Sequence, residues 1–178
     1  MTTVPVRPGA VGLVPSSSRT SPIRRALEFE ARAEAALKVF LQRWSVPALR
    51  VALGGVFLVF GALKFVPGMS PLEALVQSTW ERLTFGLITG PTAMVLTAIM
   101  EVTAGALLIA GGLFARAGLV VLAIAYVGIL SPIVLMPGEV FGAAGPTLTG
   151  QYIFKNAVLI AAALVVASSV LKGPDAKR

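Results

Sequence analysis

The sequence contains no cysteine and no histidine. Without cysteine, disulfides, thiol redox chemistry and iron–sulfur ligation are excluded, and without histidine the usual haem and zinc ligand is missing. Charge is scarce too, at 13% of the 178 residues, and acidic residues number only 8 against 15 Lys and Arg. We therefore expect no catalytic centre and no metal or other intrinsic cofactor held by the chain's own side chains.

Hydrophobic residues, in contrast, are abundant. They form 56% of the chain and give a mean hydropathy of +0.87, more than a soluble globular domain can bury. A transmembrane β-barrel would need many alternating segments of about ten residues. Instead, four continuous apolar runs come close to the ~20 residues that cross a bilayer as a helix. These runs are residues 46–65, 91–114, 118–136 and 151–171. They predict an all-α fold, a bundle of four transmembrane helices.

Basic residues are distributed unevenly around the four runs. Seven precede the first run, Arg116 falls in the predicted turn between the second and third, and three follow the fourth. The connections on the opposite side contain only Arg82. By the positive-inside rule, this pattern predicts a multi-pass protein with both termini in the cytoplasm. The first run is too long for a signal-peptide core, so we expect it to remain as an anchor.

The segments outside the runs differ in composition. Residues 1–21 are rich in Pro, Ser, Thr and Arg, which predicts a disordered cytoplasmic tail, and residues 172–178 form a second cytoplasmic tail. Residues 22–45 have an apolar and a basic face, as expected for an amphipathic helix at the inner membrane interface. Basic residues are not clustered with aromatics, so the expected partner is the lipid bilayer and not a nucleic acid.

A short helix is predicted in the connection between the first two runs. Ser70 and Glu73 have the S-x-x-E spacing of a capping box, in which each side chain accepts from the other residue's backbone N–H. Leucines then recur at helical spacing, and Trp80 and Phe85 are typical interface anchors. We expect a short outer interfacial helix here.

Glu101 is the only acidic residue inside the four runs. A carboxylate there costs roughly 2.5–3.5 kcal/mol on insertion scales, unless it is paired or faces a polar cavity. Lys64 and Lys155 lie towards the outer ends of the first and fourth runs, from which both can reach Glu101. Arg50 is the charge at the inner end of the first run.

Three further polar residues, Gln151, Tyr152 and Asn156, gather beside Lys155. Together with the charged residues they predict a polar pocket in the outer half of the bundle. Two interpretations of the pocket stay open. It is either a ligand or proton site, or a buried ion pair that fixes the register of the helices.

Two stretches resemble DoxX-type four-helix membrane proteins, and the resemblance covers about residues 46–171. They are GALKFVPGMSP at 61–71 and PTLTGQYIFKN at 146–156, with the glutamate of the second run between them. The resemblance implies a redox-associated subunit in a bacterial cytoplasmic (inner) membrane. It also implies a quinone as cofactor, and soluble partners such as a superoxide dismutase and a sulfurtransferase.

Two functions follow from these observations. The first is a membrane subunit or scaffold of an oxidoreductase complex, quinone-linked and oxidant- or sulfur-detoxifying, with a polar pocket around Glu101. The second is a small proton-coupled transporter or channel that uses Glu101 as its titrating group. The four short runs contain no inverted repeat and no broken helix, which disfavours the transporter.

Overall fold

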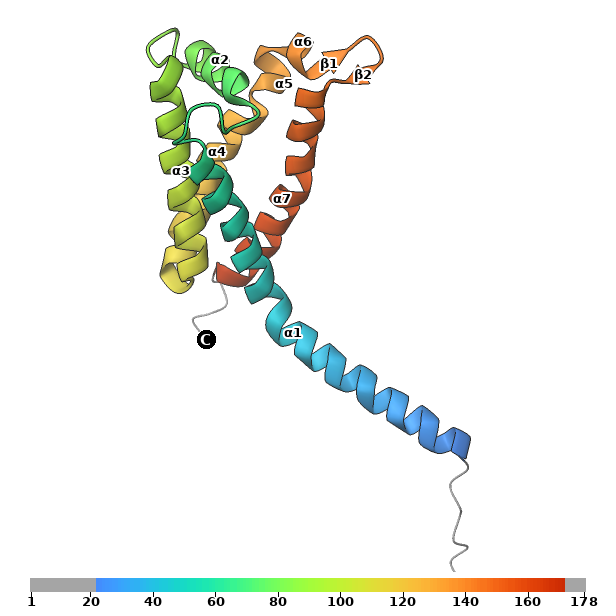
Figure 1. Cartoon of the computed structure of the whole chain (residues 1–178). Coiled ribbons are helices and arrows are strands. Elements are labelled where there is room, and N and C mark those ends of the chain that lie inside the picture. Colours follow the sequence, from blue (N-terminus) through green and yellow to red (C-terminus); the bar gives the residue numbers. More distant parts are fainter. Residues whose placement is uncertain (1–21, 172–178) are drawn as a thin grey trace, which may run out of the picture. The chain divides into compact units, whose positions relative to one another are not determined.

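The computed structural model describes residues 22–171 (Figure 1). The two predicted tails, 1–21 and 172–178, lie outside the described residues. The helices are α1 (Pro22–Leu63), α2 (Glu73–Leu83), α3 (Gly90–Ala110), α4 (Gly112–Leu130), α5 (Pro132–Leu135), α6 (Pro137–Val140) and α7 (Leu148–Val170). Two short antiparallel strands, β1 (Phe141–Gly142) and β2 (Gly145–Pro146), connect α6 to α7. The predicted all-α class is confirmed, with this hairpin as the single exception in the described part.

The described residues divide into two units, one that ends at Phe40 and one that begins at Leu41. In the described part of the first unit, residues 23–40 are helical and every side chain is exposed. The surface helix predicted at 22–45 and the span predicted at 46–65 both fall within α1, which contains Pro47. A position at a membrane surface stays a prediction for residues 22–45.

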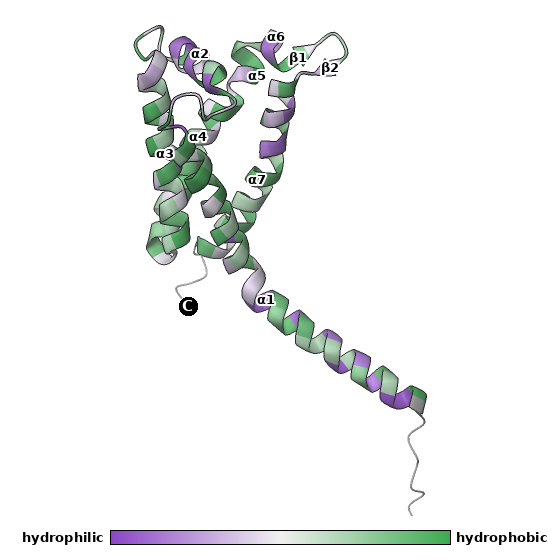
Figure 2. Cartoon of the chain, viewed as in Figure 1, coloured by the Kyte–Doolittle hydropathy of each residue, from purple (hydrophilic) through white to green (hydrophobic). Residues whose placement is uncertain are grey.

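Four helices in the described part are long and apolar enough to cross a membrane. They are Ile23–Leu63, Gly90–Ala110, Gly112–Leu135 and Leu148–Val170. Hydrophobic residues predominate on α3, α4 and most of α7, whereas α2 carries many hydrophilic ones (Figure 2). Exposed apolar side chains such as Val158 and Leu164 are stable in lipid but not in water. The four predicted spans and the multi-pass character are therefore supported.

A single residue, Gly111, joins α3 to α4. Its φ of 79° and the φ of 56° at Gly112 lie in the left-handed region, which glycine adopts without steric cost. The prediction of a turn at Arg116 is wrong, because α3 already ends at Ala110 and Arg116 lies inside α4. Arg116 Nε donates instead to the carbonyl of Val170, the last residue of α7, at 3.1 Å. The third span consequently begins at Gly112 rather than at 118.

Glycines let α1 and α3 approach closely. A Cβ atom on Gly54 would lie 2.8 Å from the Gly105 carbonyl oxygen, and one on Gly105 would lie 2.6 Å from the Leu58 nitrogen. A Cβ on Gly61 would lie 2.8 Å from the Cβ of Glu101. In lipid, where helices gain little from the hydrophobic effect, such small residues allow the close packing that holds them together. This packing brings the end of α1 against Glu101.

The bundle in residues 41–171 has two ends that differ in packing. At the end with the α3–α4 joint, called the Gly111 end, α1, α3, α4 and α7 share a hydrophobic core. The core consists of Leu53, Phe57, Ala104, Leu108, Leu122, Tyr126 and Val166. The rings of Phe57 and Tyr126 meet edge to face, 5.7 Å apart. The opposite end carries α2, α5, α6 and the hairpin, and is called the α2 end (Figure 1).

Candidate functional site

A cavity of about 640 Å³ lies at the α2 end, lined by residues of α1, α2, α3, α4 and α7. Most of its wall is apolar. Phe57, Phe60, Leu72, Leu75, Met100 and Leu159 contribute large apolar side chains. Its volume falls within the 300–1,000 Å³ that is usual for small-molecule sites, and a mostly apolar wall with a few polar groups is typical of them.

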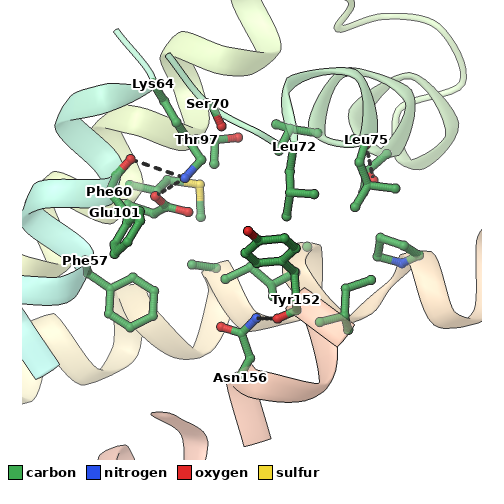
Figure 3. Close-up of a pocket in the computed structure, with 18 of the residues that line it drawn as sticks. Phe57, Phe60, Lys64, Ser70, Leu72, Leu75, Thr97, Glu101, Tyr152 and Asn156 are labelled. Atoms are coloured by element: carbon green, nitrogen blue, oxygen red, sulfur yellow. Dashed lines mark hydrogen bonds and ion pairs between the residues drawn. The ribbon is translucent and has the colours of Figure 1, made fainter. Parts of the chain in front are cut away.

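The ion pair of Lys64 and Glu101 forms one side of the cavity (Figure 3). Lys64 Nζ lies 2.7 Å from Glu101 Oε2, and the two side chains are only 12% and 6% exposed. Lys64 also donates to the Phe60 carbonyl at 3.4 Å. The predicted pairing of Glu101 with Lys64 is therefore confirmed. It depends on Gly61, because a side chain at that position would push α3 away from Lys64.

The opposite side of the cavity comes from α7. Tyr152, Lys155 and Asn156 line it, and the Tyr152 ring faces Glu101 across the space (Figure 3). The Asn156 amide donates to the Tyr152 carbonyl at 3.1 Å. Gln151 was predicted as a pocket residue, but it is exposed and is not among the lining residues.

Lys155 does not join the ion pair as predicted. Its Nζ lies 4.9 Å from the centroid of the Tyr152 ring, and it forms no ion pair with any residue in 22–171. Helical side chains lean towards the start of their helix, which carries the ammonium onto the ring three residues earlier and not across to α3. In the described structure Glu101 therefore has one cationic partner, Lys64, whereas the Lys155 ammonium contacts the aromatic ring of Tyr152.

That ring offsets only part of the cost of the Lys155 charge. A cation–π contact contributes about 0.5–1 kcal/mol at exposed sites and about 2 kcal/mol when desolvated. A lysine at the centre of a span costs roughly 2.5–3.5 kcal/mol, and one nearer a helix end costs less because its side chain can extend to the interface. Lys155 lies seven residues after Leu148, about 10 Å along α7 at 1.5 Å per residue. Its charge needs water, a lipid head group or an anion in addition to Tyr152.

Thr97, which was not predicted as a site residue, links α2 to α3 beside the cavity. Trp80 Nε1 donates to Thr97 Oγ1 at 2.7 Å, and that hydroxyl donates to the Ala93 carbonyl at 2.9 Å. Both Trp80 and Thr97 line the cavity, so Trp80 is more than the predicted interface anchor. The available signal was spacing, since Thr97 lies one helical turn before Glu101 and thus on the same face of α3.

The predicted capping box of Ser70 and Glu73 is wrong. Leu72 is the N-cap of α2, and no side chain caps this helix. Glu73 Oε2 accepts a hydrogen bond from the Gly68 backbone nitrogen at 2.8 Å, because the left-handed conformation of Gly68 (φ 76°) turns the chain towards it. Ser70 is instead one of the lining residues of the cavity.

Arg50 lies at the Gly111 end, away from the cavity. Its Nη1 donates to the carbonyl oxygens of Leu108 at 2.6 Å and Ile109 at 3.3 Å. These carbonyls belong to the last turn of α3, where helices lack internal donors and favour a positive charge. The guanidinium packs on Gly111, and a Cβ there would collide with it. Arg50 therefore caps α3, and it is not among the lining residues of the cavity.

Within residues 22–171 there is no group of three or more His, Cys, Asp or Glu side chains that could hold a metal ion. No family model, curated protein or solved structure matches this chain. The resemblance to DoxX-type proteins stays a prediction from the two stretches at 61–71 and 146–156.

Proposed function

We propose that this protein is an integral membrane subunit or scaffold of a redox-associated complex, and that its cavity binds a lipid-soluble quinone. The observation that carries the proposal is the cavity at the α2 end, whose apolar walls have polar groups on two facing sides. Lys64 and Glu101 form one side, and Tyr152 faces them (Figure 3). A ligand with an apolar body and oxygen atoms at both ends suits this arrangement.

The lining residues fit the chemistry of a quinone. Its two carbonyl oxygens are acceptors at opposite ends of a flat ring, and the Lys64 ammonium and the Tyr152 hydroxyl are donors. Phe60 and Trp80 add aromatic surface to the wall. When bound, a quinone supplies two-electron redox chemistry. The chain has no histidine or cysteine to bind a redox metal in its place. The residues of the chain bind and orient it in an environment with little water.

Location and partners belong to the same proposal. The excess of basic residues beside the chain ends supports termini in the cytoplasm, and the DoxX resemblance supports the bacterial cytoplasmic membrane. The DoxX resemblance supports soluble redox partners, such as a superoxide dismutase and a sulfurtransferase, in an oxidant- or sulfur-detoxifying assembly. The chain then supplies the membrane anchor and the quinone site of the complex.

Tryptophan fluorescence tests quinone binding, because Trp80 lines the cavity and Trp44 is the other tryptophan of the chain. Trp44→Phe protein in phosphatidylcholine nanodiscs is titrated with decylubiquinone, and we expect saturable quenching of Trp80. Gly128→Leu fills the cavity without a backbone clash, since a Cβ at this lining residue meets nothing within 4 Å. We expect it to weaken binding at least tenfold.

Gly55→Leu is the matched control. A Cβ at Gly55 also meets nothing within 4 Å, but Gly55 does not line the cavity. Its affinity should stay within twofold of the parent protein. Equal affinities of the Gly128→Leu and Gly55→Leu proteins would contradict quinone binding in this cavity. Thermal unfolding of both variants shows whether each one is folded.

Extraction in mild detergents, followed by identification of all copurifying proteins, tests the complex. We expect at least one soluble redox protein to be retained. A preparation that contains only this chain in several detergents would contradict the role as a subunit, while leaving the quinone measurement intact.

A proton-coupled transporter or channel is the second candidate, because the Glu101 carboxylate borders a cavity in the middle of a span. The 2.7 Å pair with Lys64 weakens this candidate, since it gives Glu101 a structural partner and a role that needs no transported proton. Proton flux into liposomes that falls when Glu101 is replaced by Gln would support a transporter. Flux that is absent, or the same in both proteins, would exclude it.

A further inference from the structure

The cavity has an uncompensated positive charge. Its charged lining residues are Lys64, Glu101 and Lys155. The first two neutralise each other at 2.7 Å, whereas Lys155 has no anionic partner in residues 22–171. The wall as a whole therefore carries one net positive charge, and that charge is located on α7. A neutral ring such as a quinone leaves it without a partner.

The surroundings of Lys155 prepare it for an anion. Asn156 donates its amide to the Tyr152 carbonyl, and the face of the Tyr152 ring lies 4.9 Å from the lysine nitrogen. The ring limits the movement of the ammonium and leaves its N–H groups available, because a ring face accepts no conventional hydrogen bond. The Tyr152 hydroxyl is a second donor on the same side. Lysine in a span is normally paired or directed into a polar cavity.

We infer that the cavity binds amphipathic anions, with Lys155 holding the acidic head group and the apolar walls holding a single chain. The class includes long-chain carboxylates, sulfonates and phosphate monoesters, and the head group of an anionic lipid has the same chemistry. The inference rests on the cavity of the proposed function but not on its quinone. Lys155 is the residue that determines specificity for the head group.

Three amphiphiles with the same chain and different heads test the inference. Trp44→Phe protein in phosphatidylcholine nanodiscs is titrated with dodecanesulfonate, dodecanol or dodecyltrimethylammonium, and Trp80 emission reports binding. Empty nanodiscs provide the correction for partition into lipid. We expect the sulfonate to bind at least tenfold more tightly than the alcohol, and the cationic amphiphile to bind more weakly than either.

Substitutions of Lys155 assign the effect. Lys155→Gln should lower the affinity for the sulfonate about tenfold and leave the affinity for dodecanol unchanged, whereas Lys155→Arg should retain the preference. Both variants should fold, because Lys155 is exposed and pairs with no described acid. Equal affinity for sulfonate and alcohol, or a preference that survives Lys155→Gln, would overturn the inference.

Two further arms separate this result from the proposed function and identify the source of the anion. Decylubiquinone that binds while the sulfonate does not would overturn the anion inference alone, and the reverse would overturn quinone binding alone. Replacing part of the phosphatidylcholine by phosphatidylglycerol distinguishes the sources. Competition with the sulfonate would support a lipid head group as the natural anion, and lack of competition would support a free amphiphile.

Discussion

The two ends of the four-helix bundle use charged residues in opposite ways. At the Gly111 end, Arg50 and Arg116 donate to backbone carbonyls in the last turns of α3 and α7, and the space between the helices is filled by an apolar core. At the α2 end, Lys64 and Glu101 pair with each other at the edge of a cavity. The space between the same helices is thus filled at one end and contains a cavity at the other.

This difference separates stability from binding. Capping arginines satisfy groups that any helix end leaves unpaired, so their presence needs no ligand to explain it. A buried ion pair is seldom a net source of stability, since desolvation of two charges offsets their attraction. The pair beside a cavity of about 640 Å³ therefore supports the ligand site proposed for the α2 end.

The largest expected effect comes from breaking the ion pair. Glu101→Gln leaves the buried Lys64 ammonium without an anion, which should lower the free energy of unfolding by about 3–5 kcal/mol. Equilibrium unfolding in mixed micelles measures the loss. Replacing Lys64 and Glu101 together by Met should recover most of it, because no charge is left unpaired. Full stability of the Glu101→Gln protein would show that the two ends do not differ in this respect.

A smaller effect is expected at the contact of α1 and α3. Gly105→Ala places a Cβ atom 2.6 Å from the Leu58 nitrogen, and overpacking of this kind costs about 1–3 kcal/mol. The same unfolding measurement applies. Gly55→Ala is the control, since the added methyl group meets nothing within 4 Å. Equal stabilities of the two alanine variants would mean that the glycines do not set the helix spacing.

The smallest effect tests whether the two ends are independent. Arg50→Gln removes charged hydrogen bonds to Leu108 and Ile109, which should cost about 1.5 kcal/mol of stability. Because Arg50 lies outside the cavity, decylubiquinone should quench Trp80 with an affinity within twofold of the parent. A larger change in affinity would show that α3 transmits the state of one end to the other.

Sequence predicted the features that depend on depth and charge balance. The length of an apolar run determines whether a helix can span lipid, so four spans were predictable. A lone carboxylate within a span requires a cation at similar depth, so Lys64 was predictable as the partner of Glu101. Depth does not determine which way a residue points around its helix, and for this reason the pairing of Lys155 with Glu101 and the place of Gln151 in the pocket were predicted wrongly.

Turns inside apolar stretches were harder to predict. Hydropathy cannot distinguish a helix interior from a joint of the same composition, so the end of α3 was placed past Gly111. The consecutive glycines at 111 and 112 were the usable signal, because both adopt positive φ. The Ser70–Glu73 spacing was misleading, because the Glu73 carboxylate accepts its hydrogen bond from the Gly68 backbone nitrogen and not from that of Ser70. Thr97 was not predicted as a site residue, because a threonine within an apolar helix gives no signal in the sequence. Its role follows only from the position of Trp80, which donates to it.

The one-residue joint at Gly111 has a consequence for biosynthesis. A connection of one residue prevents α3 and α4 from separating, so we expect the two helices to enter the bilayer together as a hairpin. Lys64 precedes Glu101 by 37 residues and emerges from the ribosome before it. We therefore expect the Lys64 ammonium to be in the membrane before the Glu101 carboxylate enters it, so that the carboxylate is paired on insertion.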